Sequence, residues 1–349
     1  MTTQQSPGDL IDQRIAERRV LFGGVEAAFA ALCLEGPIAL LGTARSLAAL
    51  SDDAFGGALV HRFDGVRQHN PREVVDAAGA FADAHGARSV VAIGSSSAID
   101  LGKAVADGRD VVLALVPSAL GGAEMSRGYG VLEGDRKKGG RLRSPAPVVV
   151  YDPDLLATLP PRELGSIGLN AWAHTIEAAY ARTQHALGGA AAILGGRLLP
   201  PLLLQAAKQR DRSLHRALFE AAHLAGFALD TRSMGLHHAV CHVIGGLTQI
   251  PHGIVNAIVL PHAVRANGRL APDAVASVAH AFAIPDLAAE AEAIAAAFEL
   301  PRTFAELGAP ADLVARALPR VMEQPLLPNN PAPPDEATVE ALLHGAYGA

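Results

Sequence analysis

The sequence is poor in cysteine and in charge, and each shortage excludes a class of protein. Cys33 and Cys241 are the only cysteines among 349 residues, which is too few for a disulfide framework or a four-cysteine zinc site. A reducing, cytoplasmic setting is therefore expected. The net charge of −6 argues against a nucleic-acid partner, because such proteins normally carry a basic surface and a high pI.

Targeting and membrane signals are also lacking. The polar N-terminus has no basic stretch followed by an apolar one, so it does not resemble a signal peptide. The apolar stretch 198–207 is bracketed by Arg197 and Lys208 and is shorter than a membrane crossing requires. We expect a protein without a membrane partner. Because 50% of its residues are hydrophobic, it can build a large core.

What is present in the first half is an alternation of apolar runs and helical patterns. Residues 72–85 have helical spacing, and the runs between such patterns are continuously apolar. This is typical of parallel strands buried on both faces. The sequence therefore predicts an α/β nicotinamide-binding domain with a parallel sheet over residues 1–157. The predicted strands are Pro37–Leu41, Ser89–Ile93, Val111–Val116 and Pro147–Tyr151.

The second half has no strand pattern and predicts an all-helical domain over residues 158–349, which carries the histidine cluster. A Pro/Asn-rich segment, 325–334, is expected to be extended before a last helix that begins near Asp335. The predicted helices are Glu163–Arg182, Ala186–Ala207, Ser213–Asp230, His237–Leu247 and Ala288–Phe298.

The sequence has no G-x-G-x-x-G motif after its predicted strands, but two loops of small residues stand in that place. Gly94-Ser95-Ser96-Ser97 separates a strand from a helix, where backbone N–H groups and the helix N-terminus favour a phosphate. An ordinary turn with a serine cap is the alternative. A second loop, 117–124, follows the next strand and contributes Ser118, Gly121 and Gly122. Two such loops after neighbouring strands favour a nucleotide cofactor.

A cluster of histidines is the strongest chemical signal. His238 and His242 are four residues apart and share a helix face, and His252 follows at a break. Asn170 and His174 repeat the same spacing on another helix. Imidazoles paired along helices from different segments are a familiar way to bind a divalent metal, whereas a lone histidine is usually structural.

These histidines lie in stretches that resemble the iron-containing alcohol dehydrogenases, and more narrowly the maleylacetate reductases. The stretches are Gly235–Gly246, Ile250–Gly253 and Ala257–His262, with supporting similarity over nearly all of residues 15–345. The resemblance implies a dehydroquinate synthase-like two-domain fold, a homodimer, and NADH or NADPH bound to the first domain. It implies a reductase that converts maleylacetate to 3-oxoadipate.

By position, the resemblance assigns roles to the two loops and to the histidines. Residues 94–97 would hold the cofactor pyrophosphate, and the second loop would line its nicotinamide side. His174, His238, His252 and position 170 match ligands of Fe²⁺ or Zn²⁺, while His242 matches a residue acting in proton transfer. Gly42 and Thr43, after the first predicted strand, are also expected at the cofactor. No carboxylate follows them, and Arg45 could meet a 2′-phosphate, so we expect NADPH to be accepted.

Two departures from the family pattern bear on these roles. Position 170 is Asn where the metal-dependent relatives carry Asp, so the metal site loses a negative charge and a metal-free site is favoured. The usual glycine-rich triplet has become Gly-Ser-Ser-Ser, whose hydroxyls either crowd the pyrophosphate or hydrogen-bond to it.

We hypothesise that the nicotinamide delivers hydride to the activated double bond of an acidic substrate, while His242 or His238 supplies the proton. Clustered imidazoles, His174 and His252 included, would polarise the substrate oxygen. Six basic residues lie between positions 127 and 143, and Arg127, Lys138 and Arg141 are candidates to bind its carboxylates. A solvated basic loop is the alternative.

Three other functions remain open from the sequence. The nearest is a metal-dependent alcohol or aldehyde dehydrogenase of the same family, which Asn170 and the basic segment disfavour. Another is a non-redox lyase or synthase on the related dehydroquinate synthase-like fold. The third is a non-catalytic binding protein that has kept the scaffold.

Overall fold

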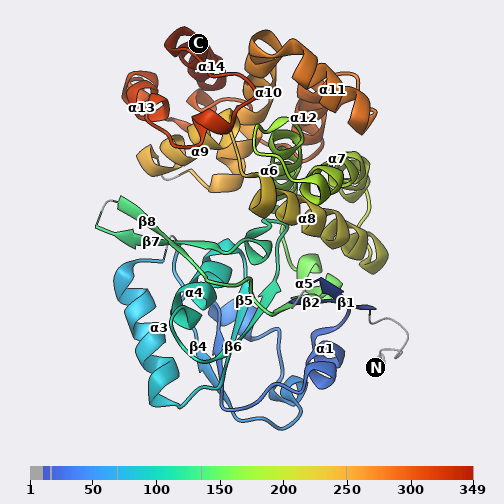
Figure 1. The fold of residues 1–349 in the computed structure, drawn as a ribbon, viewed down its shortest axis with the longest axis vertical. Helices are drawn as coiled ribbons and strands as arrows, with labels where there is room; N and C mark the ends of the chain where they lie inside the picture. The colour runs from blue at the N-terminus through green and yellow to red at the C-terminus, as the bar shows by residue number, and fades with distance from the viewer. Residues whose placement is uncertain (1–10, 16–17, 69, 135, 249, 349) are drawn as a thin grey trace. The chain divides into compact units, whose positions relative to one another are not determined.

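A computed structural model describes residues 11–15, 18–68, 70–134, 136–248 and 250–348. The chain divides into two compact units (Figure 1). Unit 1 comprises the chain up to residue 159 together with residues 211–219, and unit 2 comprises residues 160–210 and everything from residue 220 onward. Residues 211–219, which the sequence groups with the helical half, thus pack in unit 1.

Unit 1 is built on a seven-stranded sheet of order β1-β2-β9-β6-β5-β3-β4. β1 and β2 pair antiparallel, and all other neighbours pair parallel, so the predicted parallel sheet is confirmed. The sequence pattern missed β1, β2 and β4. β4 (Val60–Phe63) carries His61 and Arg62 and is only partly buried, which hides it from a search for continuous apolar runs. The other strands are β1 (Ile11–Ile15), β2 (Arg18–Phe22), β3 (Ile38–Leu41), β5 (Ser89–Gly94), β6 (Val112–Pro117) and β9 (Val148–Tyr151).

Helices cover both faces of this sheet, because alternate residues of each strand enter different cores. On β5, Val91 and Ile93 pack in the core that includes α1 (Val25–Leu32). Val90 and Ala92 face the opposite way and pack with helices α3 and α4 (Figure 1). The other helices of unit 1 have the bounds α2 (Ala44–Leu47), α3 (Arg72–Ala84), α4 (Ser96–Ala106) and α5 (Pro153–Ala157).

The basic segment 127–143 forms a hairpin. β7 (Gly128–Glu133) and β8 (Arg136–Arg141) pair antiparallel as a separate two-stranded sheet. A short 3₁₀ turn, η3 (Ala123–Met125), precedes it. The pairing fixes the register of the two strands, in which Gly128 is opposite Arg141 and Val131 is opposite Lys138.

Unit 2 contains helices and no strand among its described residues, as predicted. Its main core joins α9, α10, α13 and α14. Sequence reasoning missed α10, α11 and α13, and segment 325–334 is not fully extended, because Leu327–Asn329 forms a 3₁₀ turn. The helices are α6 (Pro161–Tyr180), α7 (Ala186–Ala206), α8 (Arg212–Arg232), which begins in unit 1, α9 (Leu236–Leu247), α10 (His252–Leu270), α11 (Pro272–Phe282), α12 (Leu287–Ala297), α13 (Leu313–Met322) and α14 (Glu336–Tyr347).

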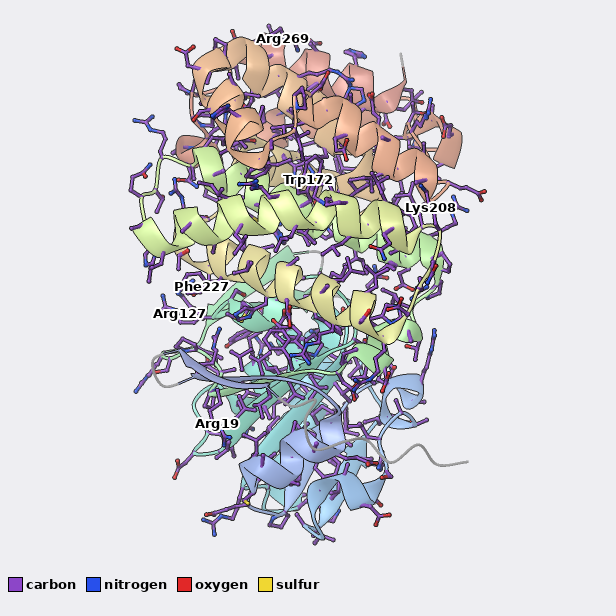
Figure 2. The ribbon with its side chains drawn as sticks, turned by 90° about the vertical axis from the view of Figure 1, so that its right-hand side faces the viewer. Arg19, Arg127, Trp172, Lys208, Phe227 and Arg269 are labelled. Carbon is purple, nitrogen blue, oxygen red and sulfur yellow. The ribbon has the colours of Figure 1, made fainter. Side chains whose placement is uncertain are left out.

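Helices α6 and α7 approach closely because glycine lies where they meet. A Cβ at Gly168 of α6 would lie 2.3 Å from a methyl of Leu203 on α7, so no larger residue fits without movement. Trp172 of α6 also contacts α7, because its indole N–H donates to the carbonyl of Gly196 at 3.1 Å. Figure 2 shows Trp172 enclosed among the helices of unit 2. The close packing holds the α6 helix, which carries Asn170 and His174, in a fixed position.

Helix α7 presents apolar side chains on its outer face. Leu187 is 68% exposed and Leu194 50% exposed, an unusual density for one helix. By length and composition α7 could cross a membrane, but the same composition is common in core helices of soluble proteins. In its most apolar window, 44% of the residues are buried inside the structure.

Candidate active site

The predicted polar cluster forms in unit 2 from three helices. Asn170 and His174 lie one turn apart on α6, and His238 and His242 one turn apart on α9. His252 is the first residue of α10, directly after Pro251. Helical spacing therefore predicted the shared faces correctly, while the packing of α6 and α10 against each other and of α10 against α9 brings the three segments together.

The side chains form a continuous row. The imidazoles of His174 and His238 stack with centroids 4.6 Å apart. His238 Nε2 lies 3.1 Å from Asn170 Oδ1. The row continues outward, with centroid distances of 6.1 Å from His238 to His242 and 6.1 Å from His242 to His252. The structure thus brings all five predicted residues into one array.

The array runs from a buried end to an exposed end. Asn170, His174 and His238 are buried, whereas His242 and His252 are exposed. Burial lowers the pKa of His174 and His238 well below the usual histidine value, and the neighbouring histidines lower it further. The buried imidazoles are therefore neutral near neutral pH, and each neutral ring offers one acceptor nitrogen.

Sequence reasoning missed the residue that organises the buried end, Glu177. Its carboxylate accepts from His238 Nδ1 at 2.6 Å and from the backbone N–H of His237 at 2.8 Å. Burial raises the pKa of Glu177, while His237 and backbone N–H groups at the start of α9 oppose that rise. Spacing could have found it, because Glu177 lies three residues after His174 and seven after Asn170 on the same face of α6.

His237 and Asn256 were also missed. His237 is buried beside His238, with the two Nδ1 atoms 3.1 Å apart, and its Nε2 lies 3.2 Å from the backbone carbonyl of Asn256. The Asn256 side chain in turn donates to the carbonyl of His252 at 2.7 Å. These contacts link the start of α9 to the start of α10, so they hold the histidine segments in register.

The donor set fits a divalent ion that accepts nitrogen ligands. Nδ1 of His174 is buried and has no hydrogen-bond partner, as expected of an atom in a site that needs a further ligand. Imidazoles suit Zn²⁺ and Fe²⁺, but Asn170 adds only a neutral oxygen. Among the described residues, one group of three His or acidic side chains has its ligand atoms within 4.8 Å of one another, namely Glu177, His237 and His238. In that group the ligand atoms are already within hydrogen-bonding distance of one another.

Three loops that were predicted to bind the cofactor converge in unit 1. They follow β3, β5 and β6, which are adjacent parallel strands, so their loops lie at one edge of the sheet. The backbone N–H of Ser118 donates to the carbonyl of Gly94 at 2.9 Å. A Cβ on Gly121 would lie 2.7 Å from Ser96 Oγ. The two small-residue loops are thus in direct contact.

Glycine is required at the first of these loops. Gly94 has a φ of +144°, and a Cβ there would lie 2.9 Å from that of Ala98. Ser95 begins α4 without a side-chain cap, so its first N–H groups remain available to a phosphate. Ser95 and Ser96 are exposed. Gly42 and Thr43 lie on the neighbouring strand end, and Thr43 caps α2 through Ser46 N. This geometry fits a dinucleotide pyrophosphate.

Two buried residues that were not predicted hold these loops in place. Asn70, with a φ of +47°, donates through its side chain to the carbonyl of Ser97 at 2.8 Å. Lys103 is fully buried, and its ammonium pairs with Asp100 at 3.0 Å and donates to the carbonyl of Ala123 at 2.8 Å. Asn70 thus ties the start of α4 to the segment before α3, and Lys103, in the last turn of α4, ties that helix to the loop that precedes the basic hairpin.

The predicted basic residues occupy different parts of the hairpin. Arg127 and Arg141 lie at its open end, where Leu142 N donates to the carbonyl of Arg127 at 3.0 Å. Lys138 is 66% exposed and forms an ion pair with Glu133. This ion pair reduces the charge that Lys138 offers to a ligand. Arg45, which lies outside the hairpin, donates to the backbone carbonyl of Thr158.

Comparisons with known proteins agree with this geometry. A family model described as the Fe-containing alcohol dehydrogenase family, C-terminal, matches residues 166–347, and one described as iron-containing alcohol dehydrogenase matches residues 32–153. A maleylacetate reductase of Burkholderia cepacia is 34% identical over 84% of this chain and 83% of its own length. One from Sphingobium indicum is 34% identical over 87% and 86%.

Solved structures show the same likeness. The crystal structure of maleylacetate reductase from Agrobacterium tumefaciens superposes with a TM-score of 0.84 at 28% identity, covering 96% of this chain and 97% of that one. The fold and site therefore define an NAD(P)-dependent oxidoreductase. The chain belongs to the iron-containing alcohol dehydrogenase family, and its relatives within that family include maleylacetate reductases. Membership implies NAD(P)H and a divalent metal as cofactors.

Proposed function

We propose that this chain reduces maleylacetate to 3-oxoadipate with NADH or NADPH. The similarity to maleylacetate reductases over more than four fifths of both chains carries the proposal. The histidine-rich array in unit 2, whose buried imidazoles are neutral, and the converging loops in unit 1 supply the parts that such a reaction needs. Asn170, a neutral residue in the array, distinguishes the site from that of a metal-dependent alcohol dehydrogenase with an Asp ligand.

The reaction transfers one hydride and one proton to the carbon–carbon double bond of maleylacetate. Hydride from the reduced nicotinamide forms a bond to the alkene carbon β to the ketone, and the electron pair of the double bond moves toward the ketone oxygen. The resulting enolate takes a proton at its α carbon, which gives 3-oxoadipate and NAD(P)⁺. The site must therefore stabilise an oxyanion and deliver a proton.

We assign the proton to His242. It is exposed, whereas His238 is buried and has hydrogen-bond partners at both ring nitrogens, Glu177 and Asn170. His174, His238, His252 and Asn170 would hold a divalent ion, which supplies Lewis-acid stabilisation of the oxyanion when it is bound.

The cofactor and the carboxylates are assigned to unit 1. The loop of residues 94–97 would bind the pyrophosphate through backbone N–H groups, and the loop of residues 118–122 and the strand end at residues 42–43 would line the rest of the cofactor. Arg127 and Arg141, at the base of the hairpin, are the better candidates for the substrate carboxylates, because Lys138 pairs with Glu133.

We further infer a homodimer that works in the cytoplasm, without nucleic-acid or membrane partners. The exposed apolar face of α7, including Leu187 and Leu194, supports burial against a second copy. The low cysteine content supports a reducing compartment.

Replacing His242 tests the assigned proton donor. His242→Ala should lower kcat with maleylacetate by about 100-fold or more, the usual contribution of a positioned general acid. Affinity for NADPH should be unchanged, because the cofactor loops are in unit 1. His344→Ala, an exposed histidine on α14, is the matched control and should keep full activity. Consumption of reduced nicotinamide measures both, and full turnover in His242→Ala would contradict the assignment.

A further inference from the structure

The contacts of His237 determine which of its nitrogens carries the proton. Its Nε2 lies 3.2 Å from the backbone carbonyl of Asn256, and a carbonyl oxygen only accepts hydrogen bonds. The proton of the neutral ring is therefore on Nε2, and Nδ1 is left as an acceptor. Burial lowers the pKa of His237, consistent with a neutral ring.

The acceptor at His237 Nδ1 limits where the neighbouring His238 ring can carry its proton. His238 Nδ1 faces two groups, Glu177 Oε2 at 2.6 Å and His237 Nδ1 at 3.1 Å. If His238 Nδ1 were unprotonated, its lone pair would face the lone pair of His237 Nδ1 in a site without solvent. A proton on Nδ1 of His238 removes that repulsion and satisfies the carboxylate. The neutral ring then has an unprotonated Nε2.

We propose that Glu177 is a positioning residue that holds His238 as the Nδ1-protonated tautomer, with its unprotonated Nε2 directed at Asn170. The carboxylate is itself held in place, because Oε1 accepts from the backbone N–H of His237 at 2.8 Å. Glu177 therefore hydrogen-bonds to both His237 and His238 at the start of α9. Its catalytic meaning depends on the proposed function, whereas the tautomer does not.

The tautomer assigns His238 the role of an acceptor. In the structure Asn170 Oδ1 lies 3.1 Å from this Nε2. With the Nδ1-protonated tautomer, the amide is turned so that its NH₂ group takes the place of the oxygen and donates to Nε2, or Nε2 binds a divalent cation. In either case His238 does not donate the proton of the reduction, so that step passes to His242. Through the ring, the Glu177 carboxylate also supplies the negative charge that Asn170 does not provide.

A single substitution separates this role from simple packing. Glu177→Gln keeps size and shape but has one acceptor and one donor. If its oxygen keeps the bond to the His237 N–H, its NH₂ group faces His238 Nδ1 and forces that nitrogen to accept. The proton then moves to Nε2, and the tautomer is reversed. Glu177→Asp keeps two acceptor oxygens and should keep the original tautomer.

The test is ¹⁵N NMR of the full chain with labelled histidine, with His238→Gln used to assign the signal. In the metal-free wild type and in Glu177→Asp, the His238 shifts should show protonated Nδ1 and unprotonated Nε2. Glu177→Gln should reverse them, while Glu163→Gln, an exposed glutamate on the same helix, should not. A wild-type His238 protonated on Nε2 overturns the proposal, even if Glu177→Gln does not fold.

Two further measurements separate this proposal from the proposed function. Glu177→Gln should lower Zn²⁺ affinity, measured by competition with a chromophoric chelator, by about 10–100-fold. It should lower kcat with maleylacetate by a similar factor and leave the KM for NADPH unchanged. Zn²⁺ affinity equal to that of the wild type contradicts the role of Glu177. A wild type with the predicted tautomer but no maleylacetate turnover supports Glu177 and contradicts only the substrate.

Discussion

At the scale of single residues, we propose that the side chain at position 170 sets the affinity of the histidine array for a divalent metal. Asn170 Oδ1 lies 3.1 Å from His238 Nε2, at the buried end of the array. An amide oxygen coordinates a cation without contributing a negative charge, and the carboxylate of Glu177 acts through the His238 ring. A neutral set of donors holds a divalent ion less firmly than one containing a carboxylate.

Asn170→Asp should therefore tighten metal binding. Two opposite unit charges about 4 Å apart attract by about 4 kcal/mol at an effective dielectric of 20, and each tenfold in affinity is about 1.4 kcal/mol. An increase of Zn²⁺ affinity by at least about tenfold is expected after chelator stripping. Gln209→Glu adds the same charge at an exposed position of unit 2 and should have no effect. Unchanged affinity in Asn170→Asp would show that position 170 is not a ligand.

The residues of the array were largely readable from sequence, because helical spacing puts Asn170 and His174, and His238 and His242, on shared faces. Glu177 was not read, although it lies on the same face as Asn170 and His174. A glutamate in a helix is usually solvated, and only the packing of α9 against α6 shows that this one is 1% exposed. Asn256 acts through its backbone carbonyl, which no sequence pattern identifies.

At the scale of secondary-structure elements, the junction of β5 and α4 is the element that we propose binds the cofactor pyrophosphate. The glycine at its start is not interchangeable, since Gly94 combines a φ of +144° with a Cβ position 2.9 Å from Ala98. The serines that replace the usual glycines are exposed at the start of α4. They leave the backbone N–H groups of the helix N-terminus accessible.

Gly94→Ala should weaken cofactor binding. Strain at such a backbone position costs about 1–3 kcal/mol, and a shift of the loop to relieve it moves the N–H groups that face the phosphate. Fluorescence titration should show at least about a tenfold loss of NADPH affinity, equal to about 1.4 kcal/mol. Gly268→Ala, on an open part of α10, is the control and should bind NADPH normally. Normal binding by Gly94→Ala would remove this loop from the cofactor site.

The central strands and most long helices were predictable, because continuous apolar runs and 3.6-residue periodicity are strong signals. Some of the elements missed gain their stability from pairing or packing that the sequence pattern does not show. β7 and β8 contain glycine and basic residues and form a hairpin by pairing with each other. α10 carries Pro261 inside it and a run of apolar residues without clear periodicity, because nearly every face of it is buried.

At the scale of the whole molecule, the chain forms two compact units, to which we assign separate chemical tasks. The sequence distinguishes an α/β half from a helical half, but it does not show that residues 211–219 return to unit 1. That segment begins α8, whose helical periodicity gives no sign that its ends belong to different units. Tyr151 of β9 and Phe219 of α8 have ring centroids 5.2 Å apart, so the segment is fixed by an aromatic contact.

We expect two copies of the chain to associate through the exposed apolar face of α7. Leu194→Asp should convert a homodimer into a 36.0 kDa monomer in light scattering. A two-fold interface would contain this side chain twice, and burying each leucine stabilises by about 1.5–3 kcal/mol. Leu59→Asp, at a residue of unit 1 that is 60% exposed, should leave the mass unchanged. A Leu194→Asp protein with the same mass as the wild type would place any interface elsewhere.

The most direct test of the proposed activity is consumption of NADH or NADPH by the purified wild-type protein with maleylacetate. The account predicts that one reduced nicotinamide is oxidised for each 3-oxoadipate formed, and that simple alcohols with NAD(P)⁺ give far slower turnover. Bound cofactor without oxidation by maleylacetate, or rapid alcohol oxidation in its place, would contradict it.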